Sequence, residues 1–214
     1  MVKKNYKWYS FLMWLIFLTP ISVIIFLFYY ASIGGFGDMP DLEVLENPKT
    51  NLASEIFTSD GKTLAKYYFN DNRTPVTFDE LPPHLVDALI ATEDIRFYSH
   101  SGIDFKRTFG AALKFGKDGG GSTITQQLAK LLFTGEGSKD IIERITQKFK
   151  EYIIAVRLER NYTKEEIITQ YLNLYDFNNN GDGIRSAARI YFGKEPIDLD
   201  INESAILVGM LKNS

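Results

Sequence analysis

The feature that most constrains this chain is an uncharged apolar run from Phe11 to Tyr30. A helix rising about 1.5 Å per residue needs about 20 such residues to cross about 30 Å of hydrocarbon. Pro20 is tolerated in a membrane helix. Aromatic residues suited to the two interfaces flank the run, at Trp8, Tyr9, Tyr29 and Tyr30. The run therefore predicts a transmembrane anchor over residues 8–31.

A cleavable signal peptide is the competing interpretation, since its basic start looks the same. Its apolar core typically spans only about 7–15 residues and ends in small residues, a pattern that residues 31–33 match poorly. The segment ahead of the run carries only basic side chains, at Lys3, Lys4 and Lys7. By the positive-inside rule, residues 1–7 form a cytoplasmic tail and the chain after the anchor lies outside the membrane.

Composition narrows the class of protein. With 45% hydrophobic and 24% charged residues over 214 positions, the chain has the make-up of a globular protein and not of a disordered one. The net charge is −3, and the remainder is more acidic once the amino-terminal lysines are set aside, which argues against a nucleic-acid partner. Cysteine is absent, which fits either redox compartment.

Beyond the anchor, the pattern predicts a mainly α protein with one small hairpin. Residues 32–51 are rich in Gly, Pro and acidic side chains and are typical of a linker. Short apolar runs flank Asp60-Gly61, which predicts a β-hairpin region over residues 52–74. Helical signals follow from Pro82 onward, with further starts predicted by a capping box at Thr163, over residues 183–193 and near Asn202.

The first catalytic candidate closes an apolar helix stripe. Leu85, Leu89 and Glu93 are four residues apart, so on a helix they share one face. A carboxylate against an apolar wall loses hydration, and this favours proton transfer near neutral pH. The simpler alternative is that Glu93-Asp94 is only the acidic end of a surface helix.

A glycine-rich segment, residues 119–121, opens a second candidate site. Ser122 or Thr123 can cap the helix that follows, and a Gly-rich entry to a helix amino end binds anions. Gln126 and Gln127 are polar side chains in an otherwise apolar helix, and a sugar or pyrophosphate would supply partners for them. A plain capped helix with exposed glutamines is the alternative.

A long helix is predicted over residues 139–160. Its apolar stripe is expected to face the core, and comprises Ile142, Ile145, Phe149, Tyr152 and Val156. Arg144, Lys148 and Glu151 share another face. That face is either a solvated row of ion pairs or the wall of a site for a pyrophosphate and a second carboxylate.

The stretch from residue 104 to 117 alternates apolar and basic side chains, among them Phe105, Lys106, Arg107 and Phe109. Such a basic amphipathic stretch suits the surface of an acidic membrane, although a solvated helix over a core fits equally well. Basic side chains outnumber acidic ones between residues 104 and 160, and this local reversal of charge indicates an anionic ligand.

Blocks typical of one family follow one another along the chain. They are Glu93-Asp94-x-x-Phe97-x-x-His100-x-Gly102-x-Asp104, Gly121-Ser122-Thr123-Ile124-Thr125-Gln126-Gln127-Leu128-Ala129-Lys130, Lys148-x-x-Glu151 and Lys164-Glu165-Glu166-Ile167. On these residues the chain resembles the peptidoglycan glycosyltransferase family, namely the monofunctional transglycosylases and the transglycosylase domain of class A penicillin-binding proteins. The resemblance covers roughly residue 54 to the end.

The resemblance implies a lysozyme-like helical catalytic domain over residues 75–214. It further implies that the protein polymerises lipid II into glycan strands at the outer face of the bacterial cytoplasmic membrane, with inversion and release of undecaprenyl pyrophosphate. The expected partners are lipid II, the growing strand, membrane lipid and other cell-wall synthesis proteins. The family's domain normally continues further, so we expect a carboxy-terminally truncated domain, from a bifunctional protein or a short homologue.

Family roles carry over to matching positions only. Glu93 would be the general base, Glu151 the second acidic residue, and Lys130 and Lys148 would neutralise the pyrophosphate. The remaining substrate-binding candidates are Asp94, Phe97, His100, Gly102, Ser122, Thr123, Thr125, Gln126, Gln127 and Arg144. No cofactor is required; a divalent cation (Mg²⁺ or Mn²⁺) sometimes assists the pyrophosphate in this family, but no metal-ligand set is evident.

The sequence departs from the family pattern beside these residues. Gln147 and Glu143 stand where arginines are usual, and Leu131 stands where asparagine is usual. Arg144 is adjacent and is a candidate substitute for the upstream arginine. Two other functions stay open: a lysozyme-like glycan hydrolase using the carboxylate pair, and a catalytically inactive membrane-anchored assembly partner.

Overall fold

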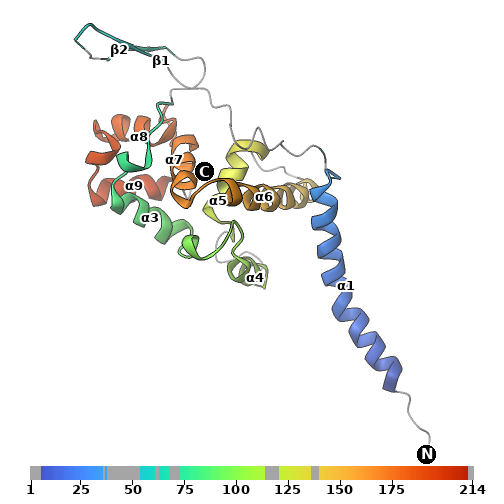
Figure 1. Cartoon of the computed structure of the whole chain (residues 1–214). Helices are drawn as coiled ribbons and strands as arrows, with labels where there is room; N and C mark the ends of the chain where they lie inside the picture. Colours follow the sequence, from blue (N-terminus) through green and yellow to red (C-terminus); the bar gives the residue numbers. More distant parts are fainter. Residues whose placement is uncertain are drawn as a thin grey trace, which may run out of the picture.

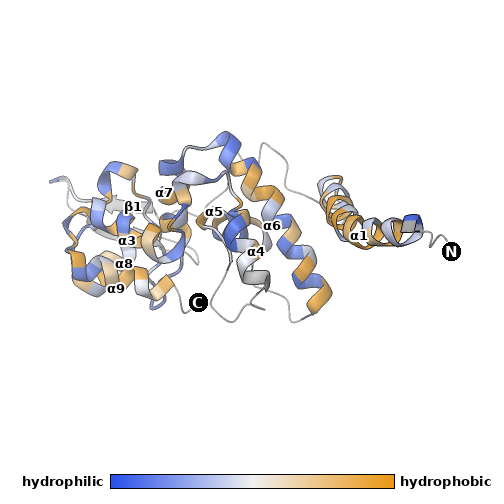
Figure 2. Cartoon of the chain, turned by 90° about the horizontal axis from the view of Figure 1, so that it is seen from below, coloured by the Kyte–Doolittle hydropathy of each residue, from blue (hydrophilic) through white to orange (hydrophobic). Residues whose placement is uncertain are grey.

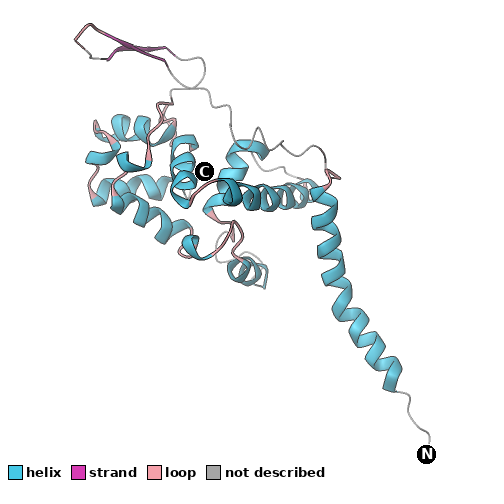
Figure 3. Cartoon of the chain, viewed as in Figure 1, coloured by secondary structure: helices cyan, strands magenta, loops and turns pink. Residues whose placement is uncertain are grey.

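The computed structural model describes residues 6–35, 37, 54–60, 63–67, 73–113, 121–135 and 140–211. Most of these residues are helical, as the sequence periodicity predicts (Figure 3). In chain order the elements are α1 (Tyr6–Ser32), β1 (Ser54–Phe57), β2 (Thr63–Tyr67), η1 (Phe78–Glu80), α3 (Pro83–Glu93), η2 (Phe97–Ser99), α4 (Phe105–Leu113), α5 (Ile124–Ala129), the π-helical η3 (Lys130–Thr134), α6 (Ile141–Asn161), α7 (Lys164–Leu174), α8 (Gly183–Phe192), η4 (Pro196–Asp198) and α9 (Ile201–Met210).

Parts of the predicted organisation fall outside the described residues. These parts are most of the cytoplasmic tail, the linker beyond residue 37, the middle of the hairpin turn, and residues 114–120 of the basic amphipathic and glycine-rich stretches.

The apolar run forms α1, which extends away from the other helices and meets α6 only near its carboxyl end (Figure 1). Most of its large apolar side chains are exposed, and hydrophobic residues recur along the helix in the hydropathy colouring (Figure 2). Within the described ranges, this is the one helix long and apolar enough to cross a membrane, over Lys7–Ser32. So much exposed apolar surface is unfavourable in water, and lipid would cover it.

The strands β1 and β2 pair antiparallel, with Ser54 opposite Tyr67 and Glu55 opposite Lys66. The register shifts between Ile56 and Phe57, as at a bulge. The pair lies apart from the helices in Figure 1 and contributes nothing to the pocket described below.

The hydrophobic core lies among the helices from α3 to α9. The stripe predicted on α3 is buried, since Leu85 and Leu89 are both 0% exposed. α3 packs against α9, and α5 packs against both α6 and α7. Full burial of each such leucine contributes about 1.5–3 kcal/mol, so these contacts dominate the stability of the domain.

Local signals in the sequence correctly predict most helix ends. Thr163 caps α7 and Glu166 completes the capping box. Thr123, not Ser122, caps α5 and accepts from the main-chain N–H of Gln126. α8 ends at Gly193, whose φ of +67° is the left-handed conformation that glycine adopts without strain.

The predicted core stripe of α6 is wrong in its amino-terminal half. Ile142 is 75% exposed and Ile145 is 52% exposed. The face of α6 that does enter the core carries Glu151, Ile154, Ala155 and Leu158.

Only the second part of the stripe, Phe149 and Tyr152, packs on α1, which meets α6 near the carboxyl end of the apolar helix (Figure 1). The ring of Phe28 lies 5.1 Å from that of Phe149, edge to face, and 6.1 Å from that of Tyr152, stacked. Periodicity identifies an apolar face, but it does not specify what covers that face.

Candidate active site

The end of α3 brings Glu93 to the surface of the core. α3 stops at Glu93, and the next residue, Asp94, leaves the helical conformation. The carboxylate of Glu93 is half-buried, and its Oε2 accepts a hydrogen bond from Nε2 of Gln127 at 2.8 Å. Arg107 donates to the main-chain carbonyl of Glu93, which fixes the backbone there.

A cavity of about 580 Å³ lies between α5 and α6. Its lining residues are Ser122, Gln126, Gln127, Lys130, Ile141, Arg144, Ile145, Gln147, Lys148 and Glu151. Cationic side chains converge on it, while the two isoleucines form an apolar side. This mixture suits a ligand with a charged head and a hydrocarbon tail.

Lys148 and Glu151 form the charged centre of the cavity wall. Nζ of Lys148 donates to Oε2 of Glu151 at 2.7 Å and to Oγ of Ser122 at 2.7 Å. Glu151 is 5% exposed, and its pairing with Lys148 compensates the burial of the carboxylate. Lys148 also lies 5.6 Å above the ring of Tyr152, an attractive cation–π arrangement.

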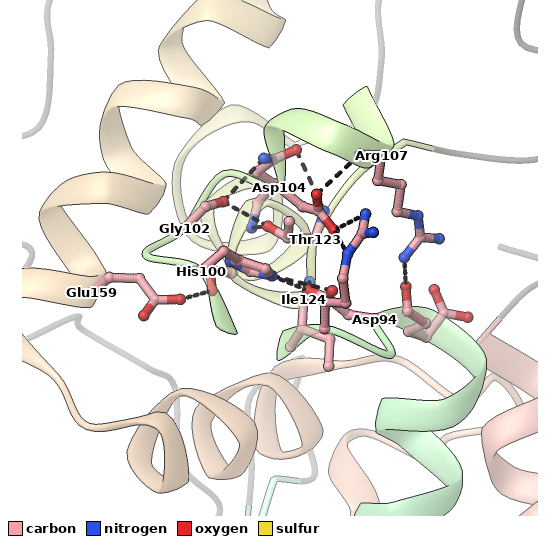
Figure 4. A network of polar contacts seen from close by, with 12 residues as sticks. Asp94, His100, Gly102, Asp104, Arg107, Thr123, Ile124 and Glu159 are labelled. Atoms are coloured by element: carbon pink, nitrogen blue, oxygen red, sulfur yellow. Dashed lines mark hydrogen bonds and ion pairs between the residues drawn. The ribbon is translucent and has the colours of Figure 1, made fainter. Parts of the chain in front are cut away.

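The loop between α3 and α4 is held by buried polar contacts around the amino end of α5 (Figure 4). Nε2 of His100 lies 3.0 Å from Oδ2 of Asp94, and the same carboxylate accepts from the main-chain N–H of Ile124 at 3.2 Å. The carbonyl of Gly102 accepts from Oγ1 of Thr123 at 2.8 Å and from Nε2 of Gln126 at 3.0 Å. These bonds attach the loop to the helix that lines the cavity.

Asp104 belongs to the same network. Burial opposes ionisation of this carboxyl, but the main-chain N–H of Arg107 and the guanidinium of Arg96 outweigh it and lower the pKa of Asp104. Arg96 Nη2 lies 2.6 Å from Oδ2 of Asp104.

Among the described residues, Asp94, His100 and Asp104 place potential metal-ligand atoms within 4.8 Å of one another. Protein groups already occupy this cluster, because Arg96 pairs with Asp104 and the Ile124 amide donates to Asp94. A metal ion would have to displace both contacts. The cluster is therefore better described as the support of the loop than as a metal centre.

The structure brings part of the predicted site together. Predicted residues that line the cavity are Ser122, Gln126, Gln127, Lys130, Arg144, Lys148 and Glu151, with Glu93 bonded to one of them. The other predicted substrate-binding residues lie in the packing behind the cavity; these are Asp94, Phe97, His100, Gly102, Thr123 and Thr125. Thr125, for example, donates to Glu159 at 2.5 Å, and the ring of Phe97 lies 4.2 Å from Nζ of Lys164.

Gln147, which stands where the family usually has arginine, forms hydrogen bonds to the backbone in the structure. Nε2 of Gln147 donates to the carbonyl of Thr134 at 3.1 Å and to that of Gly135 at 3.4 Å. Gly135 in turn donates to the carbonyl of Lys130 at 2.9 Å. Gln147 therefore fastens the carboxyl end of the π-helical segment that begins with Lys130.

Sequence reasoning missed one polar residue that adjoins the site. The hydroxyl of Tyr171, in α7, donates to Oε1 of Gln127 at 2.8 Å, and Tyr171 is fully buried. The spacing of Tyr171 among the apolar residues of α7 indicated only that it lies in the core. The available signal was that a buried tyrosine usually needs a partner for its hydroxyl.

Comparison with known proteins finds relatives over most of the chain. Residues 60–214 match the family model described as Transglycosylase. The chain is 38% identical over 179 residues to penicillin-binding protein 1A of Escherichia coli (strain K12), covering 81% of this chain and 20% of that protein. It is 36% identical over 201 residues to penicillin-binding protein 1A of Vibrio cholerae, and the match covers 92% of this chain and 23% of that protein.

A third relative comes from a different bacterium. Over 166 residues the chain is 41% identical to penicillin-binding protein 1F of Bacillus subtilis (strain 168), covering 76% of this chain and 22% of that protein. The chain thus spans about a fifth of the length of these relatives.

Proposed function

Because the chain belongs to the transglycosylase family, we propose that it is a peptidoglycan glycosyltransferase that polymerises lipid II into glycan strands in cell-wall synthesis. The observation that carries the proposal is the hydrogen bond between Glu93 and Gln127, a residue lining a cavity that also receives Lys130, Arg144 and Lys148. A half-buried carboxylate beside a cationic cavity supplies a base next to a site for a leaving anion.

Glu93 is the general base of the proposed reaction. It takes the proton of an acceptor sugar hydroxyl as that oxygen bonds to the anomeric carbon of the growing strand. The bond from that carbon to the pyrophosphate oxygen breaks, so the anomeric centre inverts. A positioned base contributes about 10²- to 10⁴-fold to such a step.

The cationic wall stabilises the departing undecaprenyl pyrophosphate. Lys130, Arg144 and Lys148 line the cavity, and their positive charges are in place before negative charge develops on the leaving oxygens. Glu151 lies beside Lys148 and is the second acidic residue of the site. The isoleucines of the same cavity offer an apolar wall to the first part of the lipid.

A divalent cation at the pyrophosphate fits this cavity poorly. Glu151 is the single carboxylate among the described residues that line it, and Lys148 already pairs with this group. Hard divalent cations prefer several oxygen ligands. We therefore assign charge neutralisation to the lysines and the arginine and include no step through a metal.

We also infer the membrane setting and the fold type from the resemblance. α1 would cross the cytoplasmic membrane once, with the lysine-rich amino end inside and the catalytic domain outside. Exposed Phe105 and Phe109 on α4, with Ile142 on α6, provide apolar contacts for membrane lipid. The mainly helical catalytic domain would be lysozyme-like, and its partners would be lipid II, the growing strand and other cell-wall synthesis proteins.

The test is polymerisation of lipid II by the full chain in detergent, followed by gel separation of the glycan products. We expect wild-type protein to lengthen glycan and the Glu93→Gln variant to lose at least about 100-fold in turnover. A Glu93→Gln variant with wild-type turnover would refute the base assignment. Release of soluble fragments from purified cell wall without consumption of lipid II would favour a hydrolase instead, and absence of both activities would favour an assembly partner.

A further inference from the structure

We propose that Tyr171 is a positioning residue for Glu93 and acts through the side-chain amide of Gln127. The proposal rests on the proposed function, because the orientation of Glu93 affects turnover only if this carboxylate removes a proton. It goes beyond that function by assigning a role to a fully buried side chain that does not line the cavity.

Three helices contribute one member each to a continuous hydrogen-bonded chain. The hydroxyl of Tyr171, on α7, donates to Oε1 of Gln127 at 2.8 Å. Nε2 of Gln127, on α5, donates to Oε2 of Glu93, the last residue of α3, at 2.8 Å. Both distances are those of well-formed hydrogen bonds.

The chemistry of the three side chains determines which group donates in each of these two hydrogen bonds. A carboxylate only accepts, so Gln127 must present its NH₂ group to Glu93 and its carbonyl to Tyr171. Burial, then the negative charge of Glu93 and then Tyr175, raise the pKa of Tyr171, so this hydroxyl keeps its proton and donates. With the tyrosine proton in place, the reversed amide, with its carbonyl toward the carboxylate, is disfavoured at both ends.

The amide orientation in turn sets the orientation of the base. Gln127 engages Oε2 of Glu93 and restricts rotation of this carboxylate. The bond therefore sets how the carboxylate oxygens are presented to a substrate hydroxyl. Without the Tyr171 hydroxyl, the Gln127 amide can rotate, and Glu93 loses its defined geometry relative to the cavity.

The experiment compares Tyr171→Phe with Tyr175→Phe in the lipid II polymerisation assay on the full chain. Each variant removes one hydroxyl from a buried ring. Tyr171 lies in α7 and Tyr175 follows its last residue, and the centroids of the two rings lie 5.8 Å apart. The hydroxyl of Tyr175 donates to the carbonyl of Leu211 at 3.2 Å, so its loss does not touch Gln127.

We expect Tyr171→Phe to lower kcat by roughly 10- to 100-fold, the size of effect that misplacement of a reacting group produces, with KM for lipid II little changed. Tyr175→Phe should keep wild-type kcat and KM. In a Gln127→Met background, which already lacks both bonds, adding Tyr171→Phe should lower kcat no further.

Equal kcat for Tyr171→Phe and wild type overturns the proposal, as does a full further loss in the Gln127→Met background. If Tyr171→Phe fails to fold, the Gln127→Met variant alone tests the proposal. A wild-type kcat in Gln127→Met then also overturns the proposal. Failure of the proposed function is recognised separately, because the wild-type chain would then form no glycan.

Discussion

The ammonium group of Lys148 lies 2.7 Å from Oε2 of Glu151, one helical turn further along α6. The lysine side chain is 36% exposed, whereas that of Glu151 is 7% exposed. Lys148 therefore compensates the charge of a nearly buried carboxylate and remains accessible from the cavity. Under the proposed function, the same lysine faces the diphosphate of the substrate.

Replacing Lys148 by Met should affect stability and turnover through separate causes. Stability should fall by about 1–3 kcal/mol, because Glu151 is left buried without its cation. Turnover should fall by about 10²- to 10³-fold, the usual effect of removing one group that stabilises developing charge. Urea unfolding and the polymerisation assay measure the two effects.

The double variant Lys148→Met/Glu151→Gln separates these causes. Removing the carboxylate charge should restore most of the lost stability and none of the lost turnover. A double variant that is no more stable than Lys148→Met would contradict the role of the ion pair.

The Gly102→Ala variant should be destabilised. Gly102 has φ of +87°, and a Cβ there would lie 2.8 Å from the carbonyl oxygen of Ala155 in α6. The backbone strain alone costs about 1–3 kcal/mol, and the contact with main-chain atoms adds to it. Thermal unfolding followed by circular dichroism measures the change.

Gly110→Ala is the matched control within the same part of the chain. Gly110 lies inside α4, and a Cβ there meets no heavy atom of the described residues within 4 Å, apart from the backbone of its own helix. This substitution should raise stability by about 0.5–1 kcal/mol, since alanine favours the helix. A Gly102→Ala variant as stable as Gly110→Ala would show that the loop can move away from α6 at no cost.

Acid should remove the stabilisation that Asp104 provides. Its pKa is lowered in the folded protein, although burial alone would raise it, because the Arg107 amide and Arg96 favour the charged form. The contribution is therefore complete above the unfolded-state pKa of about 4 and is lost as the pH falls through the folded-state value.

The difference in free energy of unfolding between wild type and Asp104→Asn should accordingly shrink below about pH 4. Urea titrations at pH 7, 5 and 3 measure it. A difference that stays constant over this pH range would mean that the stabilisation does not depend on ionisation of Asp104.

Phe28 should couple the apolar helix α1 to α6, which lines the cavity. Its ring contacts those of Phe149 and Tyr152, and Tyr152 lies under Lys148. Phe28→Ala removes aromatic pairs worth about 0.5–1.5 kcal/mol each, so the thermal midpoint should fall by a few degrees.

The control for this variant is Phe17→Ala. Phe17 lies on the same helix and is 61% exposed, and its ring pairs with that of Trp14 on α1. This variant should keep the wild-type midpoint in the same detergent. Equal midpoints for the two variants would indicate that the Phe28 contact does not stabilise α6.

Features that depend on neighbouring residues could be predicted from the sequence. The apolar run specifies α1 because a helix is the structure that satisfies its own backbone in lipid. Thr163 and Thr123 specify helix starts because their side chains accept hydrogen bonds from residues three positions later. The spacing of Leu85, Leu89 and Glu93 likewise placed a carboxylate at the end of a buried stripe.

Tertiary structure alone decided what each face meets. The apolar stripe of α6 packs on α1 only through Phe149 and Tyr152, and its first part is exposed. The core received a face that includes Glu151, because Lys148 pairs with this carboxylate. The chain from Tyr171 through Gln127 to Glu93 joins residues on separate helices. Periodicity fixes direction around one helix axis, whereas the position of one axis relative to another depends on packing of the whole core.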